Sequence, residues 1–158
     1  MNKIKYIFMV CLFNMVWAVD ISGIYKVEFE GKETYVEIFK KNNKFYAVGF
    51  ANKDGVSSDK DLKNPNPALR DRDVRGSVFV WNLTKKSAGE YAGGRIYSFS
   101  NGGEYHASAK FDGNILKLKA SKDSMGFFGK TFEWHKLSDT EIEPLQSRRI
   151  DVNTLTLP

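Results

Sequence analysis

The sequence predicts an all-β fold of about eight short antiparallel strands, arranged as an up-and-down barrel or a sandwich. Three observations support this prediction. Short runs alternate between apolar and polar residues, which is the side-chain period of a β-strand. Glycine-bearing breaks such as residues 100–103 and 112–114 separate the runs and suit tight hairpin turns. No segment shows a convincing helical period, and 158 residues suffice for one domain with a sizeable core.

The clearest alternation lies within residues 91–136. In residues 104–111 apolar side chains occupy every second position and polar ones lie between them. The apolar set is Tyr105, Ala107, Ala109 and Phe111, and the polar set is Glu104, His106, Ser108 and Lys110. Leu116 and Leu118 alternate with lysines in the same way. A charged face opposite an apolar face indicates a sheet that is buried on one side and solvated on the other.

The first 18 residues are typical of a secretory signal peptide. Two lysines precede an apolar run over residues 7–16, and Val16-Trp17-Ala18 resembles a cleavage site. We therefore expect cleavage after Ala18, a mature domain over residues 19–137, a tail over residues 138–158, and a periplasmic or secreted protein. A membrane anchor is the alternative, but the run is shorter than the roughly 20 residues that span a bilayer. The sequence thus predicts no stable membrane anchor.

Composition argues against several classes of function. The chain has 24 Lys and Arg against 19 Asp and Glu, and removing the predicted signal peptide leaves 22 against 19. This small excess is spread along the strands without a basic, aromatic-rich cluster, so we expect no nucleic-acid partner. The single cysteine, Cys11, lies in the predicted signal peptide. The mature chain would therefore carry no disulfide and depend on its core for stability.

The first three predicted strands cover residues 22–29, 33–40 and 45–51. The third is unusual because neither of its faces is charged. One face carries Phe45, Ala47, Gly49 and Ala51, and the other carries Tyr46, Val48 and Phe50. If the small side chains point into a barrel, they leave space that larger side chains would fill. A glycine-marked bulge with ordinary packing also explains the pattern.

Residues 52–75 interrupt the strand pattern. The segment is polar, and its Asn64-Pro65-Asn66-Pro67 run cannot lie in a central strand. Loops of this length often act as lids or binding loops. The triplets Asp59-Lys60-Asp61 and Asp71-Arg72-Asp73 resemble metal-binding runs, but they lack the glycine and distal glutamate of a calcium loop. We interpret both triplets as solvated charge and predict no metal site.

The remaining chain contains further strands and a tail. Residues 77–83 are hydrophobic on both faces, which indicates a central strand or one flanked by the long loop. The last strand, residues 127–136, offers Phe128, Phe132 and Trp134 on one face. Residues 138–158 include few large apolar side chains and suggest an extended or mobile segment. Either this tail covers a barrel end, or it is disordered.

The order of several short motifs resembles a known family. These motifs are Gly23-Ile24-Tyr25, Val36-Glu37-Ile38, residues 64–67, 70–76 and 91–96, Gly103-Glu104-Tyr105, Leu116-Lys117-Leu118 and residues 129–134. From residue 22 to about 137 the chain resembles the exported bacterial domain of unknown function catalogued as family 2147, a lipocalin-like (calycin) barrel. It departs from the family pattern at Tyr25 and Tyr91, where tryptophan is expected, and at Asp73, where proline is expected. The resemblance implies a barrel that can hold an internal pocket, and it implies no reaction.

Two histidines, His106 and His135, are the candidates for acid–base chemistry. Either Glu133 or Glu104 could pair with His135. Alternation places both histidines on polar strand faces, so we interpret them as exposed strand residues. No nucleophile elbow, phosphate loop, dinucleotide motif or spaced set of metal ligands occurs. The sequence therefore predicts a protein without enzymatic activity or cofactor.

A pocket for a small hydrophobic or amphipathic ligand inside the barrel is the favoured functional prediction. The candidate lining residues are apolar or aromatic side chains expected to face the interior, and each could also be ordinary core. They are Tyr25, Val36, Ile38, Phe45, Phe79, Trp81, Ile96, Tyr105, Leu116, Leu118, Phe132 and Trp134. The small residues Ala47, Gly49, Ala107 and Ala109 would leave the space.

The second functional prediction is a non-catalytic interaction module. In this hypothesis the long loop and the tail contact a protein partner and become ordered on binding. An internal cavity of some hundreds of Å³ favours the ligand binder, whereas a solid core favours the module.

Overall fold

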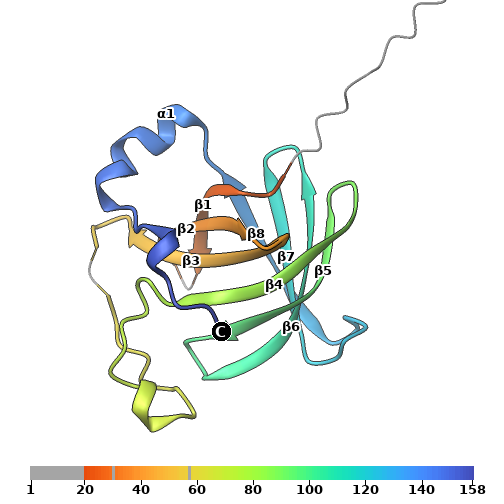
Figure 1. Ribbon diagram of the computed structural model, residues 1–158, viewed down its shortest axis with the longest axis horizontal. Coiled ribbons are helices and arrows are strands. Elements are labelled where there is room, and N and C mark those ends of the chain that lie inside the picture. Colours follow the sequence, from red (N-terminus) through yellow and green to blue (C-terminus); the bar gives the residue numbers. More distant parts are fainter. Residues whose placement is uncertain (1–19, 30, 57) are drawn as a thin grey trace, which may run out of the picture.

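Eight antiparallel strands form a closed barrel, in which each strand pairs with its neighbour in sequence and β8 returns to β1 (Figure 1). The computed structural model describes residues 20–29, 31–56 and 58–158, so the predicted signal peptide lies outside the described residues. The barrel confirms the predicted all-β, up-and-down fold. Its strands are β1 (Gly23–Phe29), β2 (Lys32–Lys41), β3 (Lys44–Asn52), β4 (Val78–Ser87), β5 (Glu90–Ser98), β6 (Gly103–Asp112), β7 (Ile115–Ser121) and β8 (Gly129–Lys136).

The two ends of the barrel differ. At the turn end, short connections join β2 to β3, β4 to β5 and β6 to β7. Ile21 is fully buried there, and its carbonyl accepts a hydrogen bond of 2.7 Å from the Tyr25 hydroxyl. Two longer connections lie at the loop end. The long loop covers residues 53–77 and contains η1 (Pro67–Leu69), and the β7–β8 loop covers residues 122–128. Ile21 therefore helps to close the turn end of the interior.

Apolar side chains that alternate along the strands fill the interior. Tyr25 pairs with Val36 across β1 and β2, and both side chains point inward. The buried interior cluster comprises Ile21, Tyr25, Val27, Val36, Ile38, Phe45, Ala47, Val80, Leu83, Tyr91, Ile96, Ala107, Ala109, Leu116, Leu118 and Trp134. Complete burial of one large apolar side chain contributes about 1.5–3 kcal/mol. This cluster is therefore the main source of stability that the described residues provide.

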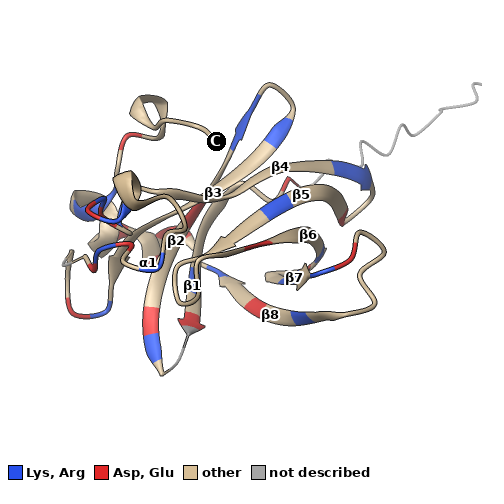
Figure 2. Ribbon diagram, turned by 90° about the horizontal axis from the view of Figure 1, so that it is seen from below, with Lys and Arg blue, Asp and Glu red and all other residues tan. Residues whose placement is uncertain are grey.

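The outward strand faces carry charges of both signs, which Figure 2 shows interspersed over the barrel. Several charges pair across neighbouring strands. Such pairs are Glu90 with Lys110, Arg95 with Glu104, and Lys117 with Glu133. Exposed ion pairs of this kind contribute at most about 1 kcal/mol each, so they add little to the stability of the core.

A bulge in β3 changes which residues face inward. Tyr35 pairs with Ala51 and Val36 pairs with Gly49, so Phe50 is an extra residue on β3. Phe50 and Ala51 both lie in a cluster outside the barrel. The prediction that Ala51 shares a face with Gly49 is therefore wrong, because the bulge shifts the alternation by one residue.

A second bulge lies in β4. Ala47 pairs with Val80 and Val48 pairs with Val78, so Phe79 is the extra residue. Phe79 and Val80 both pack on the interior cluster, and Trp81 packs outside the barrel. The prediction that Trp81 lines the interior is therefore wrong, again because a bulge shifts the alternation.

The tail packs on the outer wall of the barrel and forms α1 (Asp139–Ile142), η2 (Glu143–Arg148) and η3 (Val152–Thr154). Figure 1 shows it running from α1 across β2 and β3. Its apolar residues enter two outer clusters. In the first cluster, the barrel residues Ile24, Tyr35, Phe50 and Ala51 pack with Leu137, Ile142, Leu145 and Ile150. In the second cluster, the barrel residues Phe39, Tyr46, Val48, Val78 and Trp81 pack with Val152, Leu155 and Leu157. This cover explains why β3 and β4 are apolar on both faces.

Polar contacts also attach the tail to the barrel. Arg149 donates hydrogen bonds of 3.1 and 2.6 Å to the two carboxylate oxygens of the buried Glu37. Arg75 donates to the carbonyls of Phe50 and Arg148, which joins the long loop, β3 and the tail. Bidentate arginine–carboxylate pairs are among the stronger hydrogen-bonded contacts in proteins. The tail is therefore a packed part of the structure.

A buried aspartate holds the long loop in place. Asp61 is fully buried and accepts hydrogen bonds from Asn64, Arg72 and the Tyr97 hydroxyl at 2.7, 2.9 and 2.8 Å. A second nitrogen of Arg72 lies 2.8 Å from the same carboxylate. The prediction of solvated charge is therefore wrong for Asp61, although Asp59 is exposed. The long loop is thus fixed to β5 by a fully hydrogen-bonded carboxylate.

Candidate functional site

The residues predicted to line a pocket fall into three groups. The first group is buried in the interior cluster and comprises Tyr25, Val36, Ile38, Phe45, Ile96, Leu116, Leu118 and Trp134. Phe79, Tyr105 and Phe132 face the interior at the loop end but are only half-buried. Trp81 lies on the outer wall beside the tail. The structure therefore brings most of the predicted residues together, and it leaves three of them accessible at the loop end.

A series of aromatic contacts runs through the barrel from the turn end to the loop end. Successive ring centroids lie 5.1–6.5 Å apart in edge-on or tilted geometries, which aromatic pairs favour. The order is Phe111, Tyr25, Trp134, Phe79, Phe99 and Tyr97. The buried Trp134 lies 5.9 Å from the half-buried Phe79. A molecule that enters at the loop end therefore meets aromatic surface.

The loop end combines apolar walls, open space and a cation. A Cβ atom at Gly49 would meet no atom within 4 Å, so space is open beside β3. The rings of Phe79, Tyr105 and Phe132 face this end with part of their surface exposed. The Lys130 ammonium lies 5.2 Å from the centroid of the Phe132 ring. Apolar walls with a few polar groups are typical of ligand sites.

The Asp61 network extends to the rings at the loop end. The Arg72 guanidinium lies 5.5 Å from the Tyr97 ring centroid and 5.8 Å from that of Phe99. Burial, followed by the hydrogen bond to Asp61, raises the pKa of Tyr97 to about 12, so the phenol is protonated at neutral pH. The long loop and the aromatic residues at this end are therefore held by one network.

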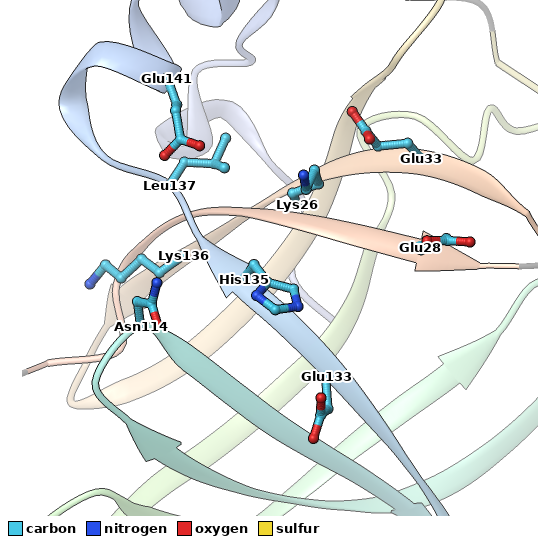
Figure 3. Close-up of a pocket in the computed structure, with 9 residues that line it drawn as sticks. All are labelled: Lys26, Glu28, Glu33, Asn114, Glu133, His135, Lys136, Leu137 and Glu141. Carbon is cyan, nitrogen blue, oxygen red and sulfur yellow. The ribbon is translucent and has the colours of Figure 1, made fainter.

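A hollow of about 500 Å³ lies outside the barrel, at the seam between β1 and β8 (Figure 3). The two strands pair only at three positions, the last of which is Val27 with Trp134. All but one of the lining side chains are charged or polar: Lys26, Glu28, Glu33, Asn114, Glu133, His135, Lys136, Leu137 and Glu141. Hydrogen bonds from the Ser138 backbone and hydroxyl lower the pKa of Glu141, and burial lowers that of Lys136. This seam hollow does not suit an apolar ligand.

The seam hollow does not assemble an acid–base pair. Among the described residues, His135 forms no hydrogen bond to Glu133 or Glu104. Those two carboxylates instead form ion pairs with Lys117 and Arg95. The second histidine, His106, lies on β6. Within the part of the chain that the structure describes, no three candidate ligands gather to hold a metal ion.

A smaller hollow of about 320 Å³ lies at the turn end. Phe45 and Tyr91 form its apolar part, and Asp20, Lys40 and Lys85 lie at its rim. Because Phe45 and Tyr91 are each 2% exposed, they separate this hollow from the interior. It is therefore a surface depression over a packed core.

Sequence reasoning missed Phe99, Arg72 and Lys130 at the loop end. A usable signal existed for Lys130, because it alternates with Phe132 and Trp134 and so belongs on the inward face. Phe99 lies in a connection outside any strand, and Arg72 lies in the long loop. Neither position carries a local pattern that indicates its neighbours.

Comparisons with known proteins agree with this architecture. Residues 23–136 match the family described as "Uncharacterized protein conserved in bacteria (DUF2147)". A solved structure of HP1028 from Helicobacter pylori, described as belonging to the lipocalin family, matches with a TM-score of 0.80 and 40% sequence identity. The match covers 85% of this chain and 94% of that one. No curated protein matches the chain. Among the described residues, no helix has the length and apolar character needed to cross a bilayer.

Proposed function

Because the chain belongs to the DUF2147 family of bacterial proteins and folds as a lipocalin-like barrel, we propose that it binds a small hydrophobic or amphipathic ligand at the loop end. One observation carries the proposal. Phe79, Tyr105 and Phe132 face the interior yet are only half-buried, and a Cβ atom at Gly49 of β3 would meet no atom within 4 Å. Covering such aromatic surface with an apolar group releases about 25 cal/mol per Å². No reaction and no cofactor form part of the proposal.

The charges at the loop end favour an amphipathic ligand with a negative head group. In the described part of the chain, the Lys130 ammonium has no carboxylate within ion-pair distance. The Tyr105 hydroxyl accepts a hydrogen bond of 3.0 Å from the Asn101 side chain, so its own proton is free to be donated to a ligand. The packed middle of the barrel around Trp134 limits how deeply an acyl chain can enter. A medium-chain carboxylic acid such as dodecanoate fits these features.

The proposal is tested by filling the open space at Gly49. Gly49→Leu adds a side chain whose Cβ atom would meet no atom within 4 Å, so we expect the barrel to fold normally. We expect the variant to bind dodecanoate at least about tenfold more weakly than the wild type in isothermal titration calorimetry. Phe111→Leu is the matched control, because Phe111 is also half-buried but lies at the turn end. Equal binding by the wild type and the Gly49 variant would contradict the proposal.

A second comparison tests the head group. Lys130→Met removes the ammonium and keeps an apolar stem beside Phe132. We expect about tenfold weaker binding of dodecanoate, because a hydrogen bond to a charged group is worth about 1.5–3 kcal/mol. Binding of dodecanol, which has no charge, should change less than twofold. Equal losses for the acid and the alcohol would show that Lys130 does not recognise the head group.

We also propose that the protein is exported to the periplasm or secreted. The support is the basic and apolar pattern of residues 1–18. Fractionation of cells that express the full chain, followed by N-terminal sequencing, tests this proposal. The expected result is a protein that begins at Val19 outside the cytoplasm, and an uncut chain in the cytoplasm would contradict it.

The packed middle of the barrel favours the alternative function, a protein-interaction module, but the long loop and the tail that it would use give it less support. Asp61 anchors the long loop, and the Arg149–Glu37 pair with the two outer clusters anchors the tail. Segments that are already packed in this way have little ordering left to gain from a partner. A pull-down in which loss of the tail removes a specific partner would favour the alternative.

A further inference from the structure

We propose that the β7–β8 loop docks this protein on an anionic lipid bilayer. Met125, Phe127 and Phe128 are 76, 75 and 73% exposed, and the next most exposed large apolar side chain of the described residues is Leu62 at 67%. The sequence prediction that Phe128 shares a strand face with Phe132 is wrong, because β8 begins only at Gly129. Three adjacent apolar side chains in solvent are characteristic of an interaction surface.

The β7–β8 loop has a fixed backbone. The Asp123 carboxylate accepts hydrogen bonds from the backbone N–H groups of Phe127 and Phe128 at 2.8 and 2.7 Å. The Lys122 backbone N–H donates to the Phe128 carbonyl at 2.9 Å, and Gly126 adopts a φ of 78°, which favours glycine. The aromatic side chains are therefore presented outward by an ordered turn. A surface that is ordered beforehand loses less entropy on binding.

The charges around the β7–β8 loop select the kind of partner. Lys119, Lys122 and Lys130 flank the apolar tip, and among the described residues none of them has a carboxylate within ion-pair distance. The only acidic residue between positions 119 and 130 is Asp123, which is engaged by backbone N–H groups. Apolar side chains that enter the acyl boundary, beneath lysines at the head groups, match a negatively charged bilayer.

The position of this loop sets the orientation of the docked protein. The β7–β8 loop and the long loop lie at the same end of the barrel (Figure 1). A protein docked through Phe127 and Phe128 therefore turns its loop end toward the bilayer. Docking does not depend on the proposed ligand, but it would place the half-buried rings of that end beside a source of amphipathic molecules.

Vesicle co-sedimentation of the full chain tests the proposal. The vesicles are phosphatidylcholine alone or phosphatidylcholine mixed with phosphatidylglycerol, and all variants share the same N-terminal segment. We expect wild-type binding to the mixed vesicles to exceed binding to phosphatidylcholine alone. Phe127→Ser combined with Phe128→Ser should bind at least about tenfold more weakly. Lys122→Glu should cost about fivefold or more, because each lysine contributes about 1 kcal/mol at such a surface.

Two matched controls change side chains of the same kind elsewhere. Leu62→Ser removes an exposed apolar group from the long loop, and Lys86→Glu reverses a charge at the turn end. Both should bind the mixed vesicles within about twofold of the wild type. In a separate experiment, the added fluorescence of Phe127→Trp should shift to the blue when mixed vesicles are added, because the indole enters an apolar region.

Several outcomes would overturn the proposal. One is equal binding of the wild-type chain to both kinds of vesicle. Another is binding of the double phenylalanine variant to the mixed vesicles that equals wild-type binding. Loss of binding in the lysine variant alone would show surface adsorption without insertion of the loop. A dimer in analytical ultracentrifugation that the double variant dissociates would assign the loop to a second copy of this chain.

Discussion

The carboxylate of Asp61 is the most constrained polar group that the described residues contain. It is fully buried, it accepts hydrogen bonds from three side chains, and its charge is paired with Arg72. Removing the Asp61 carboxylate leaves its buried donors without an acceptor. This loss costs more free energy than the intact pair contributes to stability. The long loop therefore depends on Asp61 for its contact with β5, in addition to the hydrogen bonds of Arg75 to β3 and the tail.

Asp61→Ala should lower the free energy of unfolding by about 3 kcal/mol, because Arg72 and Tyr97 lose their acceptor in a buried position. Urea unfolding followed by circular dichroism measures this change. The control is Asp59→Ala, which alters an exposed carboxylate two residues away and should change the free energy by less than about 0.5 kcal/mol. Equal effects of the two substitutions would contradict the role assigned to Asp61.

Tyr97 predicts a dependence of stability on alkaline pH. Its pKa is raised to about 12 in the folded protein, above the value near 10 of a tyrosine in an unfolded chain. The protonated phenol therefore favours the folded state below pH 10, and this contribution is lost as the pH rises toward and through 12. The free energy of unfolding should fall more steeply over this range for the wild type than for Tyr97→Phe. Parallel curves for the two proteins would refute the assignment to Tyr97.

The tail acts as a structural element because its apolar residues complete two outer clusters. Leu145 is 6% exposed and packs with Ile24 and Phe50. Leu145→Ala should reduce the free energy of unfolding by about 3 kcal/mol, through lost burial and the cavity that remains. Leu62→Ala, at an exposed position, should have little effect in the same urea titration. A small effect at Leu145 would mean that the tail can leave the wall without loss of stability.

The β7–β8 loop should lose its order when its internal acceptor is removed. The Phe128 and Phe127 backbone N–H groups lower the pKa of Asp123 and mark the carboxylate as their acceptor. Asp123→Ala should therefore speed hydrogen exchange at these two amides, with no change at amides within β7. NMR exchange measurements report both sets of amides. Unchanged exchange at Phe127 and Phe128 would show that the hydrogen bonds do not maintain the loop.

Alternation along the strands predicted the elements well and failed where the period changes. Tyr25, Val36 and Leu118 were placed correctly because β1, β2 and β7 continue without a shift of phase at these positions. Ala51 and Trp81 were misplaced because a bulge adds one residue and reverses the faces of the residues after it. Gly49 directly precedes the extra residue Phe50, so the glycine-marked bulge that the sequence suggests in β3 is confirmed, whereas nothing in the local sequence marks the bulge at Phe79.

Interactions between distant parts of the chain were beyond local reasoning. The local sequence indicates solvated charge at Asp61, because its partners Arg72 and Tyr97 lie 11 and 36 residues away. The tail sequence suggests a mobile segment because its apolar residues are widely spaced. In the structure these residues pack in outer clusters to which β2, β3 and β4 contribute side chains. The residues of β3 and β4 are hydrophobic on both strand faces, and this pattern indicates that another segment covers the outer face of these strands.

The whole molecule is a barrel whose interior is packed at the turn end and accessible at the loop end. Ile21 and Tyr25 close one end, whereas Phe79, Tyr105 and Phe132 remain half-buried at the other. The sequence predicted the barrel and most of its inward residues, since both depend on period-two patterns. It could not predict which end is accessible, because that depends on loop packing and on side-chain volumes around the closed sheet.

A titration of the isotope-labelled chain with dodecanoate, monitored through backbone amide chemical shifts, tests the proposed function most directly. We expect saturable shifts at Gly49, Phe79, Tyr105 and Phe132, and no comparable shifts at Lys40 or Lys85 of the turn-end hollow. Saturable shifts at Lys26 and Glu141 of the seam hollow, or no saturable shifts at any residue, would contradict a ligand site at the loop end of the barrel.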